Sequence, residues 1–313
     1  MGGFIGSHLC DSLVKQGANV RAFVRYNSRG DWGLINSPHK EIEIVAGDLR
    51  DLDAVRRAMV GVSHVFHLGA LIAIPYSYLH PAEVVETNII GTMNVLLAGR
   101  DGDVERIIHT STSEVYGTAL RVPIDENHPL QGQSPYSASK IGADKLAESF
   151  FRSFNLPLVT LRPFNTYGPR QSARAVIPTI ISQALTQPYI RLGNVAAMRD
   201  LTFVTDTVSG FLRVGEVDGV LGETFNLGTG QEVKIMDLAN EIVSLLGKNL
   251  EIVIDPDRLR PENSEVQRLV SDNRLARERL NWSPGVSLRA GLAQTIAWIS
   301  ENINLYRPEV YQV

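Results

Sequence analysis

The sequence is short of cysteine, of long apolar runs and of net charge. Its single cysteine, Cys10, excludes an intrachain disulfide and favours a reducing compartment. We find no run of about 18 apolar residues that would span a membrane, and no basic segment followed by an apolar leader. A net charge of -4 gives no general attraction to nucleic acid or to an anionic membrane. We therefore expect a soluble cytoplasmic protein without nucleic-acid or membrane partners.

Repeats, low-complexity segments and zinc-type Cys/His spacings are also missing. His67 and His109 lie at the ends of expected strands, where we expect them to be packed or hydrogen-bonded rather than to bind a metal. The chain has 313 residues, of which 44% are hydrophobic and 20% charged. That length is enough for one large α/β domain or for two smaller ones.

Segments with strand and helix periodicity alternate along the first half of the chain. We expect strands at 18–24, 41–46, 62–66, 106–110 and 156–161, and helices at 7–16, 53–59, 82–98 and 138–154. This alternation predicts crossover connections and an α/β fold with a parallel sheet. From Tyr167 onward the pattern loosens. There, helices at 236–247 and 288–300 and a strand at 250–254 predict a smaller α/β lobe.

The chain opens with three glycines in its first six residues, directly before a helix. Gly3 and Gly6 suit a diphosphate, because glycine lets backbone N–H groups approach an anion at the positive end of the helix. A cloning scar or a frayed end is the alternative interpretation. Asp48 comes directly after a strand, where its carboxylate can accept from an adenine amine, and Asp51 is positioned to cap the next helix.

Two polar clusters lie at or after later strands. Ser111-Thr-Ser-Glu-Val-Tyr-Gly117 ends one strand, and Tyr136-Ser-Ala-Ser-Lys140 begins a helix. A spacing of four places Tyr136 and Lys140 on one helical face. We expect the ammonium to lower the pKa of the phenol from about 10 toward neutrality, which would make it a general base for a hydroxyl. A Tyr-x-x-x-Lys pair alone is common on protein surfaces, but here it accompanies a hydroxyl-and-carboxylate cluster and a nucleotide-type opening.

These motifs together resemble the extended short-chain dehydrogenase/reductase family of nucleotide-sugar epimerases and dehydratases. The likeness runs from Gly3-Phe-Ile-Gly6 to Leu280-Asn-Trp-Ser-Pro284. It implies a doubly wound parallel sheet of the Rossmann type, in an NAD(P)-binding domain of residues 1–166 with about 200–222, and a nucleotide-sugar lobe of 167–199 with 223–313. It also implies cofactor contacts from Gly3, Phe4, Ile5, Gly6, Asp48, Leu49, Ala70, Tyr136, Lys140 and Pro163.

The same resemblance implies a catalytic group and a substrate-binding group. The catalytic residues would be Thr112, Ser113, Glu114, Tyr136 and Lys140. The substrate-binding residues would be Asn165, Arg170, Arg199, Arg260 and Glu265, with the arginines on the diphosphate and Glu265 near the ribose. Guanidinium groups suit phosphate oxygens because their paired donors match them.

The reaction depends on the two residues directly after Thr112. Glu114 offers a second base, which a simple 4-epimerase does not need, so the resemblance favours a nucleotide-sugar 4,6-dehydratase in cell-surface polysaccharide biosynthesis. The stretch Arg260-Pro-Glu-Asn-Ser-Glu-Val266 resembles the GDP-sugar dehydratases, acting on GDP-mannose or GDP-N-acetylglucosamine. A UDP-glucuronate decarboxylase and a 4-epimerase are the enzyme alternatives. A nucleotide-sensing scaffold on the same fold is the non-enzyme alternative.

The cofactor is expected to be NADP or NAD. Enzymes that bind NAD commonly have an acid after the second strand, but here none occurs before Asp31. Arg25 and Arg29 occupy that region and suit a 2′-phosphate, which slightly favours NADP.

Two further expectations come from the resemblance. The family pattern begins with an apolar strand and a first glycine that have no counterpart here, so we expect the middle strand of the sheet to be missing, through truncation or an incorrectly assigned start. The long helices at 82–98 and 138–153 are expected to pair with their copies in a homodimer joined by a four-helix bundle.

Overall fold

The computed structural model describes residues 2–35 and 42–309. Its central element is a four-stranded parallel sheet of β3 (His64–His67), β4 (Arg106–Thr110), β5 (Leu158–Pro163) and β9 (Thr224–Leu227). In register, His67 lies beside His109, and Arg162 lies beside Asn226. The expected α/β fold with parallel strands is confirmed.

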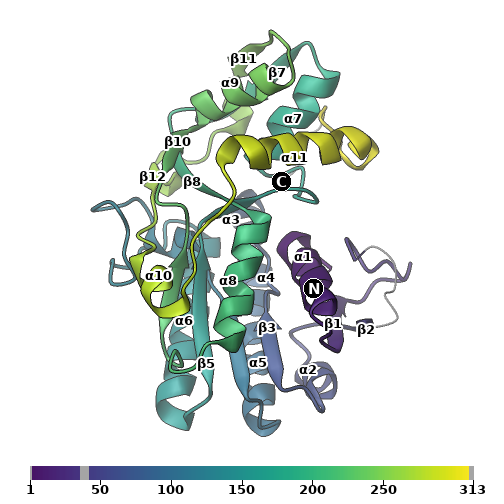
Figure 1. The fold of residues 1–313 in the computed structure, drawn as a ribbon, viewed down its shortest axis with the longest axis vertical. Coiled ribbons are helices and arrows are strands. Elements are labelled where there is room, and N and C mark those ends of the chain that lie inside the picture. The colour runs from purple at the N-terminus through teal and green to yellow at the C-terminus, as the bar shows by residue number, and fades with distance from the viewer. Residues whose placement is uncertain (1, 36–41, 310–313) are drawn as a thin grey trace.

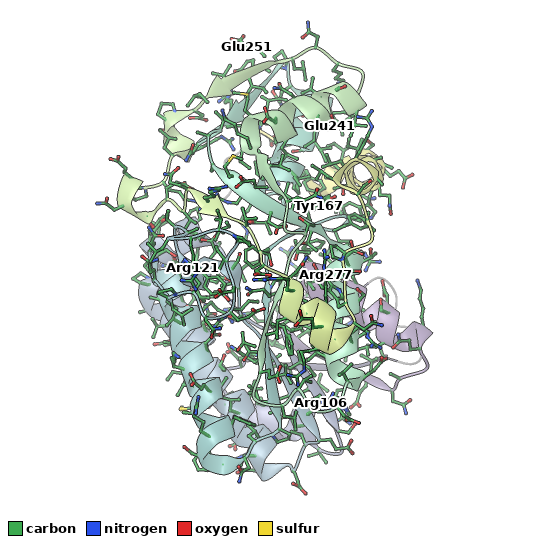
Figure 2. The ribbon with its side chains drawn as sticks, turned by 60° about the vertical axis from the view of Figure 1, so that its left-hand side comes forward. Arg106, Arg121, Tyr167, Glu241, Glu251 and Arg277 are labelled. Atoms are coloured by element: carbon green, nitrogen blue, oxygen red, sulfur yellow. The ribbon has the colours of Figure 1, made fainter. Side chains whose placement is uncertain are left out.

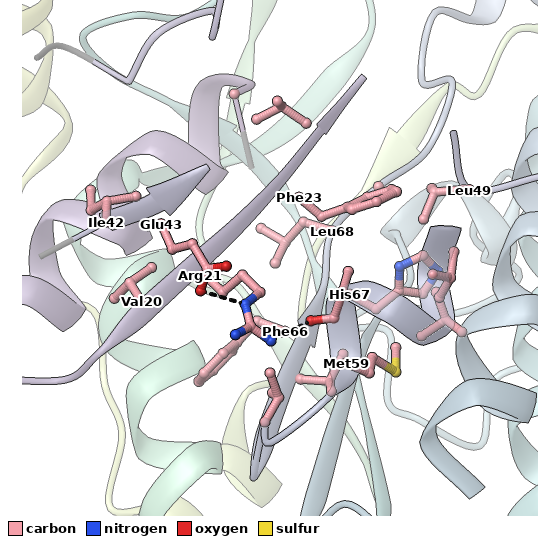
Figure 3. A pocket seen from close by; sticks show the side chains of 18 of the residues that line it. Val20, Arg21, Phe23, Ile42, Glu43, Leu49, Met59, Phe66, His67 and Leu68 are labelled. Atoms are coloured by element: carbon pink, nitrogen blue, oxygen red, sulfur yellow. Dashed lines mark hydrogen bonds and ion pairs between the residues drawn. The ribbon is translucent and has the colours of Figure 1, made fainter. Parts of the chain in front are cut away.

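The second parallel unit is the pair β1 (Val20–Arg25) and β2 (Ile42–Gly47). Glu41, the first residue of the expected second strand, lies outside the described residues. The pair forms a sheet of its own rather than joining β3. A cavity of about 1350 Å³ is lined from both sides, by Val20 and Phe23 of β1 and by Phe66 and His67 of β3 (Figure 3).

Helices cover both faces of the four-stranded sheet. Successive side chains of β4 point to opposite faces of the sheet and so pack against different helix layers, because side chains alternate along a strand. Ile108 packs with Leu9 of α1 (Phe4–Lys15) and Phe211 of α8 (Val204–Glu216). Ile107 packs with Leu96 and Phe150 beneath the other helices. Figure 1 shows α1 and α8 close together on the first face.

The second face carries α2 (Leu52–Met59), α6 (Pro135–Phe154) and a long helical stretch. That stretch consists of α4 (Pro81–Val85), the π-helical turn η1 (Glu86–Ile90) and α5 (Gly91–Asp101). The sequence predicted one regular helix here, whereas the structure inserts the π turn. Asn88, in that turn, is fully buried, and its amide bonds both Leu71 O (2.9 Å) and Ser139 Oγ (2.9 Å).

The remaining elements form a smaller lobe and its connections. One sheet contains β6 (Asn165–Tyr167), β8 (Met198–Phe203), β10 (Glu232–Lys234) and β12 (Arg268–Leu269), and a second pairs β7 (Tyr189–Leu192) with β11 (Glu251–Ile254). The helices are α3 (Ile74–Leu79), α7 (Val176–Thr186), α9 (Ile235–Leu245), α10 (Arg274–Leu280) and α11 (Leu288–Glu301). The short helices are η2 (Ser113–Tyr116), η3 (Pro256–Arg258), η4 (Glu262–Ser264) and η5 (Ile303–Leu305).

The two lobes occupy opposite ends of the molecule. Glu251 lies at the outer end of the smaller lobe, and Arg106 lies toward the other end, at the start of β4 (Figure 2). Tyr167 lies between them, where its hydroxyl donates to Leu288 O of α11 (3.1 Å). Among the described residues, no helix combines the length and apolar character needed to cross a membrane.

Candidate active site

Helix α6 begins in a way that fixes Tyr136 and Lys140. Ser134 is its N-cap, and Pro135 occupies the first helical position. The Ser134 and Ser137 side chains form a reciprocal capping box, with Ser137 N donating to Ser134 Oγ (3.1 Å) and Ser134 N to Ser137 Oγ (2.9 Å). Tyr136 and Lys140 then lie one turn apart, with 7% and 3% of their surfaces exposed.

The end of β4 brings Thr112, Ser113 and Glu114 to the same place. The Thr112 hydroxyl caps η2 by accepting from Glu114 N (3.2 Å), and it also forms a hydrogen bond with the Tyr136 phenol that lowers the phenol pKa. Ser113 is buried, whereas Glu114 is half-buried and lies close enough for its charge to affect Tyr136. The hydroxyl-and-carboxylate cluster and the Tyr/Lys pair, separated in the sequence, therefore meet.

The expected lowering of the Tyr136 pKa is wrong for this structure. Burial raises the pKa of the phenol well above its usual range, the Thr112 hydrogen bond opposes this, and the charges of Glu114 and Asp144 add to the rise. Lys140 directs its ammonium to Thr110 O (2.7 Å). Spacing alone predicted the positive charge but revealed neither the burial nor the two carboxylates.

Lys140 is itself shifted. Burial lowers the pKa of its ammonium from 10.5 to about 8, and the charge of Asp144 works against that decrease. The ammonium form therefore predominates below pH 8 and is lost above it.

Sequence reasoning missed the polar cluster beneath this pair. Asp144, four residues after Lys140 on α6, binds His109, Ser111 and Arg162, all of them buried. The four-residue spacing from Lys140 is a signal that could have indicated Asp144. Asn88 was also missed, because it is one of several polar residues in the expected helix at 82–98 and nothing in the sequence distinguishes it. His67 and His109 are hydrogen-bonded, as expected, to Thr92 Oγ1 (2.9 Å) and Asp144 Oδ1 (3.0 Å).

Five of the residues expected to hold a cofactor line the cavity between β1 and β3. They are Gly3, Arg25, Asp48, Leu49 and Ala70; Leu49 is labelled in Figure 3. Gly3 is the N-cap of α1, and a Cβ there would meet nothing within 4 Å, so an anionic group has room to approach the helix start. This combination of a large groove, a glycine at a helix N-terminus and polar groups at strand ends fits a dinucleotide.

Other residues in the predicted cofactor segments make packing, capping or strand-pairing contacts within the protein. The Phe4 and Ile5 side chains pack against the core, and Gly6 is buried, which leaves their backbone for ligand contacts. Asp51 caps α2 by accepting from Asp53 N (3.0 Å) and Ala54 N (3.1 Å), so the capping alternative is correct. Pro163 ends β5, beside Leu227 of β9.

The charged cofactor candidates are exposed and partly paired. Arg50 forms a forked interaction with Asp48, at 3.0 Å and 2.7 Å, and this hydrogen-bonded contact lowers the pKa of Asp48. Arg25 lies 3.7 Å from Glu83, and the backbone N of Arg29 bonds Asn27 Oδ1. The predicted contacts of Asp48 with adenine and of Arg25 and Arg29 with a 2′-phosphate stay predictions.

The predicted substrate residues separate into two places. Arg199 and Arg260 both approach Glu265 Oε1, at 3.1 Å and 3.8 Å. Arg170 instead forms an ion pair with Asp11 of α1 (2.8 Å). Burial lowers the pKa of Arg199, and the charges of Glu114 and Glu265 raise it, so Arg199 lies between the catalytic cluster and the Glu265 cluster. Asn165 Oδ1 is buried and has no hydrogen-bond partner among the described residues.

One family model and one curated relative match nearly the whole chain. Residues 1–295 match the family model described as GDP-mannose 4,6 dehydratase. The chain is 33% identical over 301 residues to a UDP-glucose 4-epimerase of Mycolicibacterium smegmatis, covering 94% of this chain and 95% of that protein.

Two solved structures are similar over nearly the full length. One is the dTDP-glucose 4,6-dehydratase DesIV of Streptomyces venezuelae with NAD bound, with a TM-score of 0.87, 28% identity, and coverage of 98% of this chain and 97% of that one. The other is a UDP-glucose 4-epimerase of Thermotoga maritima with UDP-glucose, with a TM-score of 0.89, 28% identity, and coverage of 96% and 97%. These relatives thus carry out two different reactions.

Proposed function

The chain belongs to the NAD(P)-dependent nucleotide-sugar dehydratase and epimerase family of extended short-chain dehydrogenases/reductases, and within it we propose a nucleotide-sugar 4,6-dehydratase. The observation that carries this proposal is the position of Glu114. Its carboxylate lies beside Tyr136 and Thr112, and within electrostatic reach of Arg199. A 4,6-dehydratase needs a base at C5 in addition to the acid–base group at the 4-oxygen, and Glu114 supplies it.

Chemistry at C4 is assigned to Tyr136, Thr112 and Lys140. Tyr136 accepts the proton of the sugar 4-hydroxyl, and Thr112 donates a hydrogen bond to the 4-oxygen. Because burial raises the pKa of Tyr136, its phenolate needs positive charge nearby, and we assign that role to Lys140 on the same helical face. When bound, the nicotinamide cofactor supplies temporary hydride storage between C4 and C6.

Glu114 acts on C5 and C6. The 4-ketone acidifies the hydrogen at C5, and the Glu114 carboxylate takes that proton. Glu114 then gives the proton to the departing C6 hydroxyl, so one water leaves and the carboxylate is restored. We assign both transfers to Glu114 because Ser113 is a poor acid at this position. When hydride returns to C6, Glu114 delivers a proton from solvent to C5, and Tyr136 releases the proton of the 4-hydroxyl to solvent.

Arg199 and Arg260 are proposed to hold the diphosphate, with Asn165 and Glu265 beside them. We also propose that cofactor and sugar nucleotide divide between residues 1–166 with about 200–222 and residues 167–199 with 223–313. The segment 260–266 and the matched family model favour a GDP-sugar. The roles of Arg170 in substrate binding and of Arg25 and Arg29 in NADP preference are proposals of the same kind, as is a cytoplasmic location.

A 4-epimerase is the second candidate, because the relatives include two UDP-glucose 4-epimerases. It would use Tyr136, Thr112 and Lys140 and leave Glu114 without a part in the reaction. A UDP-glucuronate decarboxylase would lose carbon dioxide from a 4-keto acid at the same site. A nucleotide-binding scaffold would show cofactor binding without turnover.

A substrate panel separates these reactions. The protein with NAD or NADP is incubated separately with GDP-mannose, GDP-N-acetylglucosamine, dTDP-glucose, UDP-glucose and UDP-glucuronate, and the products are weighed by mass spectrometry. We expect a product lighter by one water from a GDP-sugar. An isomer of unchanged mass, a product lighter by carbon dioxide, or cofactor binding with no product would each contradict the proposal and select one alternative.

A homodimer is proposed through the face formed by α4, η1, α5 and α6. Val85 and Ile90 on this stretch are 41% and 40% exposed, although both are apolar. Light scattering should give twice the chain mass. A Val85→Glu/Ile90→Glu variant should run as a monomer, and an unchanged mass would argue against this face.

A further inference from the structure

The buried cluster beneath the proposed catalytic pair is centred on Asp144. Its carboxylate, 5% exposed, accepts from three side chains at the ends of two neighbouring strands. His109 Nε2 of β4 lies 3.0 Å from Oδ1, Ser111 Oγ lies 2.8 Å from Oδ2, and Arg162 of β5 reaches Oδ2 through Nε (3.2 Å) and Nη2 (3.0 Å). Arg162 is anchored in turn by Tyr116, whose hydroxyl lies 2.9 Å from Nη1. The cluster thus joins α6 to the ends of two central strands.

This cluster is adjacent to Lys140 in two ways. Positions 136, 140 and 144 are spaced four apart, so all three side chains lie along one face of α6. The Lys140 ammonium donates to Thr110 O (2.7 Å), and Thr110 lies in the sequence between His109 and Ser111, the residues that bind Asp144. Residues 109–111 therefore bind both the Lys140 ammonium and the Asp144 carboxylate.

The other charged and titratable groups near Lys140 come from each neighbouring element. They are His67 of β3, His109 of β4, Arg162 of β5, and Tyr136 and Asp144 of α6. Burial lowers the pKa of both His67 and His109, so both rings are neutral at neutral pH. Arg162 is positive and Tyr136 is neutral there. Asp144 is therefore the negative charge in this group that opposes the loss of the Lys140 proton.

We propose, building on the proposed function, that Asp144 is a positioning residue that keeps Lys140 in its ammonium form and holds the start of α6 against β4. Asp144 touches neither substrate nor cofactor in this scheme. It acts through Lys140, whose charge the phenolate of Tyr136 requires. A purely structural Asp144 would hold the helix but leave the Lys140 titration unchanged, and this difference makes the proposal testable.

The decisive measurement is the titration of Lys140 itself. The chain contains six lysines, so the ε-carbon signals of a ¹³C-lysine sample can be assigned with a Lys140→Met variant. The starting point is a lysine whose pKa burial has already lowered to about 8. In Asp144→Asn, which keeps the shape but removes the charge, we expect Lys140 to lose its proton about 1 pH unit lower. The alkaline limb of kcat/KM should move by the same amount.

Two variants serve as controls. Ser111→Ala removes one hydrogen bond from the same carboxylate but keeps its charge, so the Lys140 titration should match that of the parent. Asp144→Asn alone leaves Arg162 buried without its partner, which threatens folding. Asp144→Asn/Arg162→Gln removes both charges together and should fold. Because the loss of the Arg162 charge raises the Lys140 pKa by itself, this double variant is compared with Arg162→Gln, and its Lys140 titration should lie below that of Arg162→Gln.

The outcomes separate this inference from the proposed function. A Lys140 titration in Asp144→Asn/Arg162→Gln that matches that of Arg162→Gln overturns the inference, as does a shift in Ser111→Ala equal to that in Asp144→Asn. The titration is read without turnover, so it judges Asp144 even if the substrate panel yields no product. A panel without product would contradict the dehydratase proposal alone.

Discussion

The guanidinium of Arg199 and the carboxylate of Glu265 form a buried ion pair, with 3.1 Å between Nη2 and Oε1. Arg260 approaches the same oxygen at 3.8 Å. One carboxylate thus lies between two guanidinium groups at the edge of the catalytic cluster. Paired guanidinium donors bind phosphate oxygens as readily as carboxylate oxygens, so this is the part of the smaller lobe best suited to a diphosphate.

The first prediction concerns Arg199. Arg199→Gln should raise the KM for the sugar nucleotide about 10- to 100-fold, because hydrogen bonds to charged groups contribute about 1.5–3 kcal/mol. Steady-state kinetics and product inhibition by the nucleoside diphosphate measure the effect. Arg191→Gln, an exposed arginine of β7 that bonds Tyr189, is the matched control and should leave KM unchanged. Equal effects of the two substitutions would remove Arg199 from the diphosphate site.

The second prediction concerns Glu114. Glu114→Gln keeps the size of the side chain but removes the base, so hydride transfer from C4 should continue while water elimination stops. Absorbance at 340 nm should then show accumulation of reduced cofactor without a product lighter by one water. In the parent enzyme, solvent deuterium should appear at C5 of the product. Full turnover by Glu114→Gln would show that another group is the base at C5.

The strands and helices with a clear hydrophobic period were predictable from the sequence. The strand at 106–110 was expected at the bounds that β4 has, because it contains two consecutive β-branched residues, Ile107 and Ile108, which face the two helix layers. Helix α8 and strand β9 were not predicted. Residues 224–227 are only four, and their role depends on pairing with β5, which lies far away in the sequence. The π turn at Asn88 was also invisible, because it leaves the apolar spacing almost unchanged.

The candidate site was predictable where it depends on spacing and not where it depends on burial. The spacing of Tyr136 and Lys140 indicated a shared helical face, which the structure has. The direction of the Tyr136 pKa was wrong, because depth beneath the surface and the nearness of Glu114 and Asp144 are properties of the folded chain. The ion pair of Arg170 with Asp11 could not be predicted from the sequence either, because the two residues are 159 positions apart.

The third prediction concerns cofactor choice. Arg25, the last residue of β1, lines the cavity and lies 3.7 Å from Glu83, and Arg29 follows four residues later in the chain. Arg25→Ala/Arg29→Ala should weaken NADP binding about tenfold and leave NAD binding within about twofold, because only NADP has the 2′-phosphate. Calorimetric titration with each cofactor measures both affinities. If both affinities fall equally, the two arginines do not select the phosphate.

The fourth prediction concerns stability, because Lys140 is charged while 3% exposed. Its folded pKa of about 8 lies below the ordinary 10.5, so the unfolded chain binds the proton more tightly. By linkage, the free energy of unfolding of the parent should rise as pH increases from about 8 to 10.5. Below pH 8 the buried ammonium destabilises the folded state by its full amount. Lys140→Met removes that charge, and it should be about 3 to 3.5 kcal/mol more stable than the parent at pH 7, given ~1.36 kcal/mol per pKa unit. The variant should also be inactive, and its difference in stability from the parent should shrink to nearly nothing by pH 10.5.

Urea unfolding at several pH values measures this difference. The exposed Lys145→Met is the control, and its stability should stay within about 0.5 kcal/mol of the parent throughout. A Lys140→Met protein less stable than the parent at pH 7 would mean that the hydrogen bond to Thr110 O outweighs the burial of the charge.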